Sequence, residues 1–238
     1  MEERRATRAL IHSENLLGNM AAIRNAVPEG TLICASVKAD AYGHGAERVS
    51  QLLRDRGAEY LGVATPWEGL MLRKGEAADD GPIILYGPAS EQEIPIILQA
   101  GLETMVTSRR YIEALATAAT SERTSLKVHL KVDTGMGRVG CPPEEAMALA
   151  KEIDASPALT LRGLATHFPV ADSTDAADIR FTEKQFATLT GLAADIRQAG
   201  LDPGIVHAAN SGGIALHSNT AAMMVRPGIA LYGSGQPL

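Results

Sequence analysis

The sequence is poor in aromatic residues and in cysteine, and it contains no long apolar run. Aromatic residues make up 4% of its 238 residues, which disfavours a base-stacking surface or a carbohydrate cleft. Its two cysteines, Cys34 and Cys141, lie at unrelated positions and predict neither a disulfide scaffold nor a zinc cluster. No apolar run approaches the ~18 residues that span a membrane, and residues 1–13 carry no secretory signal. We therefore expect a soluble, cytoplasmic protein.

Positive charge is also scarce. Lys and Arg together number 22 against 28 Asp and Glu, which gives a net charge of −6, and no basic cluster stands out. Such a chain is a poor partner for nucleic acid or for an anionic membrane. Hydrophobic residues (45%) and charged residues (21%) are in the balance of an ordinary globular protein, which excludes disorder over the whole length.

What the chain does have is an alternation of short apolar runs and longer amphipathic stretches. Eight runs predict strands, at residues 31–37, 60–64, 82–86, 103–106, 126–132, 159–166, 204–208 and 223–226. The stretches between them predict helices, among them 47–55, 91–99, 109–118, 144–153 and 182–198. Eight such units in this length predict an α/β fold, a (β/α)8 TIM-type barrel forming one domain over residues 1–238. A doubly wound open sheet is the alternative, but no Gly-x-Gly-x-x-Gly follows the first run.

The beginning of the chain predicts a further strand and a helix. Residues 7–12 could form the strand, and Ser13 is in position to cap the helix that follows. The apolar residues of that helix recur at helical spacing before Pro28 ends it: Leu16, Leu17, Met20, Ile23 and Val27.

In a barrel of this kind, chemistry gathers at the carboxyl ends of the strands. Period-two alternation places Cys34, Ser36 and Lys38 on the inward face of the first predicted strand, with Lys38 at the mouth. A lysine there can form a Schiff base if burial or a neighbouring cation lowers its pKa. The alternative is a lysine whose amine simply reaches solvent from a strand end.

The fifth predicted strand carries charge on one face. Lys127, His129, Lys131 and Asp133 alternate with apolar residues, whereas a parallel strand buried on both sides is normally apolar on both. Either this stretch is a solvated edge, or its charges are paired inside a functional interior. The glycine-containing turn that follows can place Arg138 over the mouth of the barrel.

Two glycine-containing segments follow the seventh and eighth predicted strands. They are Asn210-Ser211-Gly212-Gly213 and Arg226-Pro227-Gly228-Ile229. Backbone N–H groups with a serine hydroxyl make an anion cradle, and these two loops form the usual phosphate site of the barrel; the alternative is a pair of simple capped turns. His167, which ends the sixth predicted strand, is a lone histidine. No spacing typical of metal ligands and no Gly-x-Ser-x-Gly is present, so we predict neither a metal site nor a serine triad.

Together these segments resemble the N-terminal barrel domain of alanine racemase. The segment Val37-Lys38-Ala39-Asp40-Ala41-Tyr42-Gly43-His44-Gly45 is similar to the motif that attaches pyridoxal phosphate in that family. Further similar segments follow in the same order, at residues 131–138, 166–168, 209–211 and 226–233. The likeness extends over nearly the whole chain, and it is much weaker to the small stand-alone pyridoxal-phosphate homeostasis proteins that share the barrel.

The resemblance implies racemisation of L-alanine to D-alanine with pyridoxal 5′-phosphate, a reaction that supplies bacterial cell-wall synthesis. Lys38 would be the catalytic residue, holding the cofactor as an aldimine and exchanging the α-proton. The implied cofactor-binding residues are Lys38, Tyr42, Arg138, His167, Asn210, Ser211, Arg226, Gly228 and Ile229. Within that set Arg226 contacts the pyridine nitrogen with His167 as its support, and Arg138 also contacts the substrate. Lys131 matches a position that is carbamylated in many members.

One departure from the family is large. Its second base is a tyrosine of a C-terminal β domain that reaches the partner subunit of a homodimer, and no tyrosine of this sequence matches it. Racemisation needs groups on both faces of the α-carbon. We therefore expect a truncated racemase domain that is inactive or severely impaired alone. The alternatives are a pyridoxal-phosphate-binding module without turnover and a barrel-type amino-acid decarboxylase, and serine or another small amino acid could replace alanine.

Overall fold

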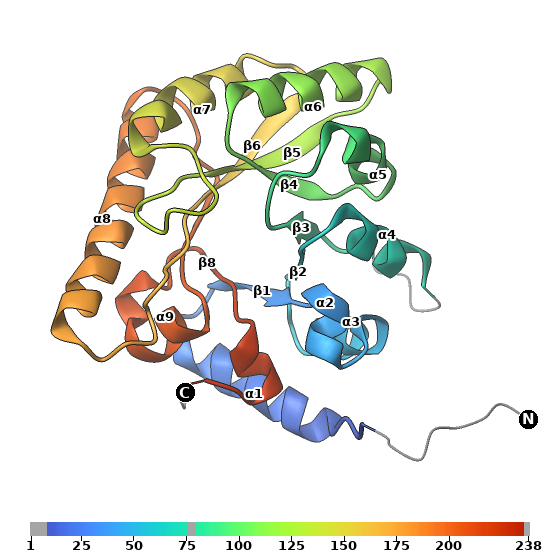
Figure 1. Cartoon of the computed structure of the whole chain (residues 1–238), viewed down its shortest axis with the longest axis vertical. Helices are drawn as coiled ribbons and strands as arrows, with labels where there is room; N and C mark the ends of the chain where they lie inside the picture. Colours follow the sequence, from blue (N-terminus) through green and yellow to red (C-terminus); the bar gives the residue numbers. More distant parts are fainter. Residues whose placement is uncertain (1–8, 76–79, 236–238) are drawn as a thin grey trace, which may run out of the picture.

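The barrel that the sequence predicts is closed and entirely parallel. In the computed structural model, which describes residues 9–75 and 80–235, eight strands pair in chain order and the last pairs with the first (Figure 1). They are β1 (Leu32–Ser36), β2 (Tyr60–Val63), β3 (Ile83–Leu85), β4 (Glu103–Val106), β5 (Leu126–Lys131), β6 (Leu159–Ala165), β7 (Ile205–His207) and β8 (Met224–Val225). Each predicted strand contains one of them, which confirms the (β/α)8 barrel and excludes the open doubly wound sheet.

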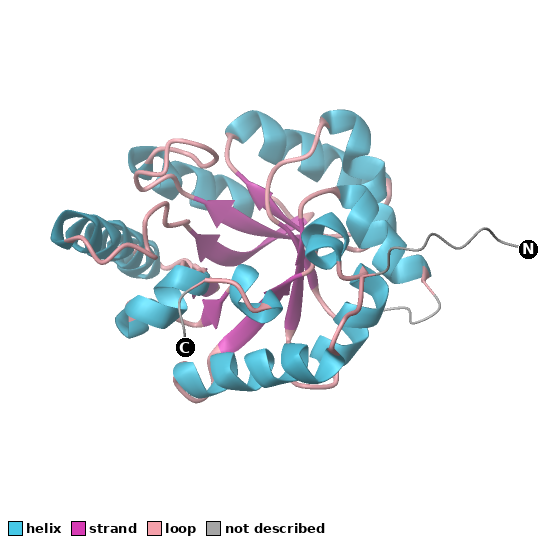
Figure 2. Ribbon diagram, turned by 60° about the horizontal axis from the view of Figure 1, so that its bottom comes forward, coloured by secondary structure: helices cyan, strands magenta, loops and turns pink. Residues whose placement is uncertain are grey.

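Helices surround the strands (Figure 2). They are α1 (Ser13–Ala26), α2 (Lys38–Gly43), α3 (Ala46–Arg54), α4 (Pro66–Lys74), α5 (Ile94–Gln99), α6 (Arg109–Ser121), α7 (Ala146–Asp154), α8 (Ala176–Gln198) and α9 (Ser211–Leu216). Short 3₁₀ turns lie at η1 (Glu91–Glu93), η2 (Pro143–Glu145), η3 (Ser218–Thr220) and η4 (Ile229–Tyr232). Within the described residues, no helix combines the length and the apolar character needed to cross a bilayer.

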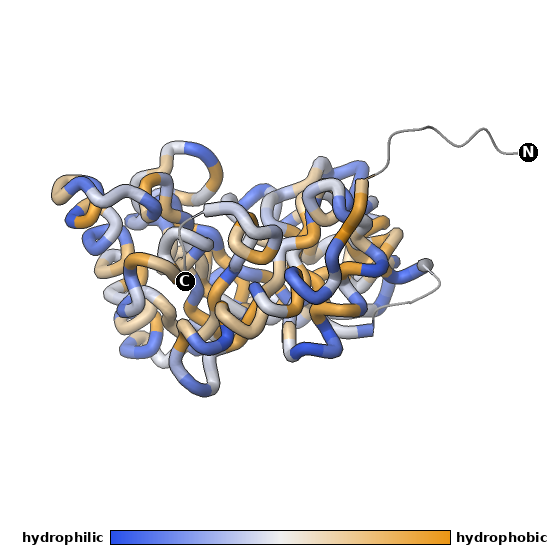
Figure 3. The backbone as a smooth tube through the Cα atoms, turned by 90° about the horizontal axis from the view of Figure 1, so that it is seen from below, coloured by the Kyte–Doolittle hydropathy of each residue, from blue (hydrophilic) through white to orange (hydrophobic). Residues whose placement is uncertain are grey.

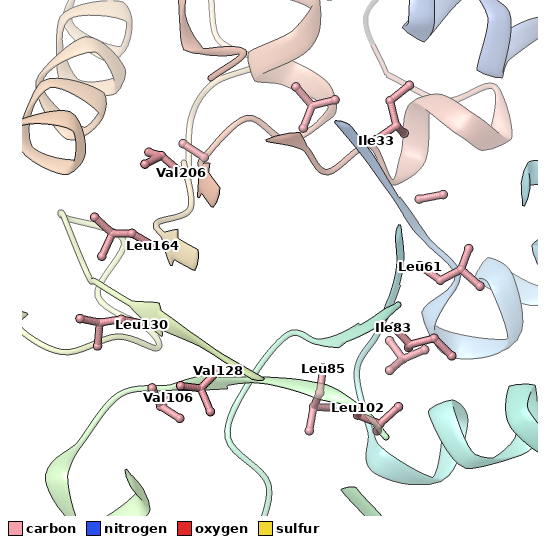
Figure 4. Close-up of a cluster of buried hydrophobic side chains, with 14 of the residues drawn as sticks. Ile33, Leu61, Ile83, Leu85, Leu102, Val106, Val128, Leu130, Leu164 and Val206 are labelled. Atoms are coloured by element: carbon pink, nitrogen blue, oxygen red, sulfur yellow. The ribbon is translucent and has the colours of Figure 1, made fainter. Parts of the chain in front are cut away.

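Alternate residues of each strand belong to two apolar layers. Leu61, Val128 and Leu164 point from the ring of strands towards the helices and form part of the larger core (Figure 4). Cys34 and Met105 belong instead to a smaller cluster inside the barrel. Apolar and polar segments alternate along the backbone rather than dividing it into halves (Figure 3). The prediction that Cys34 faces the inside of the barrel is therefore confirmed.

The predicted strand at residues 7–12 is wrong where it can be compared. Residues 7 and 8 lie outside the described residues, and residues 9–12 form no strand. Leu10 and Ile11 are exposed, because no strand in the described part of the chain pairs with them. Ser13 is also not the cap: it is the first residue of α1, and the capping position is His12, whose side chain accepts no hydrogen bond.

The remaining differences concern helix bounds and the helices α2, α4 and α9, which lie outside the predicted helical ranges. The predicted helices at 91–99 and 144–153 each begin with a 3₁₀ turn, and α8 starts six residues before the predicted 182. Helix α4 was not predicted, although its start carries a local signal. Thr65 and Glu68 form a capping box, and Pro66 occupies the first helical position.

Candidate active site

A cavity of about 380 Å³ opens at the carboxyl ends of the strands. All ten residues singled out in the sequence line it: Lys38, Tyr42, Lys131, Arg138, His167, Asn210, Ser211, Arg226, Gly228 and Ile229. Four of its lining side chains are lysine or arginine, and Asp172 is the carboxylate among the lining residues. This excess of positive charge favours an anionic ligand. Among the described residues, no group of three or more His, Cys, Asp or Glu side chains could hold a metal ion.

Lys38 follows β1 and stands at the rim of this cavity. Burial lowers the pKa of its amine, and the positive charge of Arg138 lowers it further, against an opposing effect of Glu68. A lowered pKa leaves more of the amine neutral near pH 7, and the neutral amine is the nucleophile. Lys38 is half-buried, and its Nζ lies 5.8 Å from the centroid of the Tyr42 ring.

The residues after Lys38 make a left-handed turn. Ala39, Asp40, Ala41 and Tyr42 have φ between 51° and 54°, a region that costs a residue with a side chain about 1–2 kcal/mol each. Glu68 at the start of α4 compensates for part of this, since its carboxylate accepts the N–H of Ala39 at 2.9 Å. Asp40 accepts the N–H of Ala46 at 2.7 Å from the other side of the turn.

The turn places the Tyr42 ring at the wall of the cavity, 5.8 Å from Lys38 Nζ. The ring packs on Tyr232, with 4.9 Å between centroids, and Tyr232 donates from its hydroxyl to the carbonyl of Ser36 at 2.8 Å. A Cβ added to Gly228 would lie 2.7 Å from the Tyr42 oxygen. A side chain at this point of the loop after β8 would require the Tyr42 oxygen to shift, so glycine is the residue that lets the phenol lie this close to the backbone.

The loops after β7 and β8 are joined by one hydroxyl. Ser211 Oγ accepts the N–H of Gly228 at 3.0 Å and that of Ala230 at 3.2 Å, which leaves its own proton free for an acceptor in the cavity. Ile229 begins η4, where an N–H has no partner inside the turn. The Gly228 N–H, expected at the phosphate, is engaged with Ser211 here.

Asn210 has a structural task in this arrangement. Its side-chain oxygen accepts the N–H of Gly213 and caps α9, and its amide donates to the carbonyl of Phe168 at 3.0 Å. It lines the cavity with both ends of its amide already engaged.

Arg226, at the end of β8, is buried and donates in several directions. Nη2 donates to the carbonyls of Thr166 at 2.6 Å and Ala208 at 3.0 Å, and Nη1 donates to His207 Nδ1 at 2.6 Å. A guanidinium has five N–H groups. The described part of the chain supplies no acceptor for the remaining two, on Nη1 and Nε, and Arg226 lines the cavity.

His167 was expected to support Arg226, and its Nδ1 lies 3.5 Å from Arg226 Nη2. His207 is the shorter contact, by almost an ångström. Burial lowers the pKa of His167 to about 2, and the positive charges of Arg226 and Lys131 act in the same direction. His167 is therefore a neutral imidazole on the wall of a cationic cavity.

The inward charges of β5 belong to the interior rather than to a solvated edge. Lys131 is 5% exposed, and burial followed by the positive charge of Arg226 holds its pKa well below the usual range. Asp133, just beyond the strand, organises the turn that carries Arg138. Its carboxylate accepts the N–H groups of Gly135, Gly137 and Arg138 at 2.9–3.1 Å. Burial raises the pKa of Asp133, but these hydrogen bonds outweigh it and lower the pKa overall.

Several residues in or around the candidate site were not predicted from the sequence. His207 and Glu103 were not considered, His129 was noted only as part of a charged face, and Tyr86 and Glu68 were not connected to the site. The available signal was a polar residue inside a strand that is otherwise apolar on both faces. For Glu68 it was the capping box at the start of α4.

A closed parallel barrel, with a half-buried lysine of lowered pKa and further lysine and arginine side chains lining a cavity at its carboxyl rim, defines a (β/α)8-barrel protein with a candidate site for an anionic ligand that reacts with an amine. A family model described as "Alanine racemase, N-terminal domain" matches residues 11–236. The chain belongs to this family.

Individual relatives agree with this assignment. An alanine racemase of Treponema denticola is 43% identical over 229 residues, which are 96% of this chain and 60% of the relative. The structure of an alanine racemase from Clostridium difficile 630 matches with a TM-score of 0.89 and 32% identity over 94% of this chain and 61% of that one. One from Bacillus anthracis with bound L-Ala-P matches with a TM-score of 0.84 and 28% identity over 97% and 60%. The chain thus spans about 60% of the length of these relatives.

Proposed function

We propose that this chain binds pyridoxal 5′-phosphate and, as part of a longer protein, racemises alanine. The observation that carries the proposal is the placement of Lys38, whose amine is half-buried and has a lowered pKa, on the rim of the same cavity as the anion-accepting loops after β7 and β8. The family and the relatives named above support it.

The donors of the cavity fit this cofactor group by group. The hydroxyl proton of Ser211 and the N–H of Ile229 suit a phosphate, and the Tyr42 oxygen lies beside them over Gly228. The spare N–H groups of Arg226 suit a ring nitrogen that accepts a hydrogen bond. Lys38 supplies the amine that an aldehyde requires.

When bound, pyridoxal phosphate withdraws electrons from an attached amino acid and makes its α-proton acidic. Lys38 would take up and return that proton on one face. Arg226 would donate to the ring nitrogen without giving up its own proton, so the nitrogen stays unprotonated and electron withdrawal stays moderate. This restraint favours simple return of the proton over transamination.

A second proton-transfer group has to face the other side of the α-carbon. Tyr86 does not suit this role, because its hydroxyl contacts Ser36 Oγ at 3.0 Å and Cys34 Sγ at 3.3 Å. Tyr42 does not suit it either, because its hydroxyl oxygen lies against the backbone at Gly228. We therefore propose that the second group comes from a part of the whole protein, or of a partner subunit in a homodimer, that this sequence does not include.

Lys131 carries a further proposal, carbamylation. Its buried amine has a pKa well below the usual range and, among the described residues, no hydrogen-bond or ion-pair partner. A neutral amine adds carbon dioxide by forming an N–C bond and releasing one proton to solvent, and the resulting carbamate would bring negative charge near the cations Arg138 and Arg226. The intact mass of the chain in bicarbonate buffer, with Lys131→Met as the control, tests this step.

The proposed cofactor site is tested by reductive labelling. Pyridoxal 5′-phosphate is added, borohydride reduces the adduct, and peptide mass spectrometry locates the pyridoxyl group. We expect labelling of Lys38, with the lysines Lys74 and Lys151 as internal controls and Lys38→Arg as the matched variant. Labelling scattered over the surface lysines would overturn the proposal.

Turnover is tested separately. The purified chain is incubated with L-alanine, and the D-alanine formed is measured. We expect binding without substantial racemisation, which corresponds to a cofactor-binding module for these 238 residues alone. Turnover comparable to that of an intact racemase would contradict the absence of the second group. No observation in the structure favours the decarboxylase alternative.

A further inference from the structure

Four buried side chains form one hydrogen-bonded chain across the interior of the barrel. Arg226 Nη1 lies 2.6 Å from His207 Nδ1, and His207 Nε2 lies 3.0 Å from His129 Nδ1. His129 Nε2 lies 2.9 Å from Glu103 Oε2. The four residues come from the ends or interiors of β8, β7, β5 and β4, and none is more than 6% exposed. Arg226, at one end, lines the cavity. Glu103 is at the other end, where its Oε1 lies 3.7 Å from Nζ of the exposed Lys127.

Arg226 and Glu103, at the two ends of this row of side chains, determine the direction of every hydrogen bond in it. A guanidinium only donates and a carboxylate only accepts. Burial lowers the pKa of His129 and holds that of His207 well below its usual range, so each ring carries one proton near pH 7. His207 must then accept at Nδ1 and donate from Nε2, and His129 must do the same. This is the single arrangement in which all three contacts have a donor and an acceptor.

The surrounding backbone leaves space for these four hydrogen-bonded side chains. A Cβ on Gly163 in β6 would collide with the His129 ring, and the pairing of β5 with β6 shifts register between Val128 and His129. The two imidazoles meet edge to face, with centroids 5.0 Å apart. Buried polar groups of this kind are costly unless each is satisfied. The barrel therefore holds a polar path that apolar side chains would fill at lower cost.

We propose that Glu103 is a positioning residue for Arg226 and that it acts through His129 and His207. With Glu103 as acceptor, His207 presents a lone pair at Nδ1, and Arg226 is held with its spare N–H groups at the cavity. Without that acceptor, Arg226 still prevents the two imidazoles from reversing, so the buried N–H of His129 is left unsatisfied. The value of this placement for cofactor binding rests on the proposed function, but the hydrogen-bond order does not.

The order is tested first by nitrogen NMR of the chain labelled in histidine and free of cofactor. We expect both His129 and His207 as the Nε2–H form. Glu103→Gln should preserve this pattern, because the amide oxygen can still accept. An Nδ1–H form of His207 in the unaltered chain, or a reversed pattern in Glu103→Gln, would overturn the proposal. Neither result depends on a variant with an apolar side chain being able to fold.

The coupling is tested by a double-mutant cycle in urea. Glu103 and Arg226 do not touch, so independent residues would give additive losses of stability. We expect the fall in the folding equilibrium constant on Glu103→Leu to be smaller by about threefold or more when Arg226 is already Leu, because the imidazoles are then free to reverse. Ile84→Ala, in the strand position paired with Glu103, should be additive with Arg226→Leu. Additivity for Glu103→Leu as well would overturn the proposal.

These outcomes separate the inference from the proposed function. Reductive labelling of Lys38 reports on the cofactor site, whereas the NMR and urea experiments contain no cofactor. If Lys38 is not labelled but the expected tautomers and coupling are found, the positioning role of Glu103 stands and the proposed function fails. If Lys38 is labelled but the expected tautomers are absent, only the positioning role of Glu103 fails.

Discussion

The oxygen of Tyr42 lies 2.7 Å from the position where a Cβ on Gly228 would begin. The two residues are far apart in the sequence, and their contact joins the turn after β1 to the loop after β8. Both residues line the cavity. A methyl group at Gly228 would therefore have to displace the Tyr42 oxygen.

Gly228→Ala is expected to weaken binding of pyridoxal 5′-phosphate by about tenfold or more, because the methyl group pushes Tyr42 from its place. Most of the loss should vanish in a Tyr42→Phe background, since the nearest remaining ring atom would be 3.5 Å from the Cβ. The dissociation constant from the absorbance of the bound cofactor measures both effects. Gly18→Ala, with nothing within 4 Å, is the control. An equal loss in both backgrounds would contradict the steric cause.

Arg138→Gln is expected to slow labelling of Lys38 near neutral pH. Burial and the charge of Arg138 both lower the pKa of the amine, so removing the charge raises that pKa and reduces the neutral fraction at a given pH. The midpoint of the labelling rate against pH should move upward by about 0.5 to 1 unit. Arg110→Gln, at an exposed ion pair, should leave the midpoint in place. A downward shift would contradict the electrostatic account.

The stability of the chain is expected to fall on acidification from pH 6 to pH 5. Burial lowers the pKa values of His129, His167 and His207 in the folded state, that of His167 to about 2. The unfolded chain therefore binds more protons below the ordinary histidine pKa of about 6.5, and stability present above that pH is lost as the pH falls.

Each such histidine contributes a slope of up to about 1.4 kcal/mol per pH unit to the free energy of unfolding. His167→Asn should flatten the dependence by about that amount, as measured by urea unfolding at each pH. His12→Asn, at an exposed position before α1, serves as the control. An unchanged slope in His167→Asn would show that its imidazole takes up a proton in the folded state.

Ala39→Gly is expected to stabilise the chain, by about 0.5–1 kcal/mol, since glycine adopts the left-handed conformation of this turn without steric cost. Ala21→Gly, at an exposed position within α1, should destabilise it by about 1 kcal/mol. Thermal unfolding of the two variants gives the comparison. Destabilisation by both would mean that the strain in the turn is smaller than its dihedral angles indicate.

The sequence was informative about the barrel and the rim of its cavity, because both follow from short-range patterns. Period-two alternation placed Cys34 and Lys38 inward, and the glycine-rich segments marked the loops after β7 and β8. The left-handed turn after Lys38 could not be predicted in this way. Of its four residues only Asp40 belongs to a type that is enriched at positive φ, and the turn is held by Glu68, which is distant in sequence.

The row of hydrogen-bonded side chains inside the barrel could not be predicted from the sequence, for a different reason. Glu103, His129 and His207 lie on separate strands, and each alone looks like a single polar residue in an apolar run. Their meaning depends on the pairing of the strands around a closed barrel, which brings them within hydrogen-bonding distance. The same dependence explains why His167 was expected beside Arg226, where His207 makes the shorter contact.

The chain from Glu103 to Arg226 also limits how this barrel can be re-engineered. Each member is satisfied by its neighbour, so replacing one leaves a buried donor or acceptor without a partner. A more stable scaffold, or one adapted to a different cofactor, would require an exchange of all four side chains as a block. Gly163 would have to stay, because a Cβ there would also lie 2.7 Å from the carbonyl oxygen of Ile205. Libraries that vary these positions one at a time would discard the useful combinations.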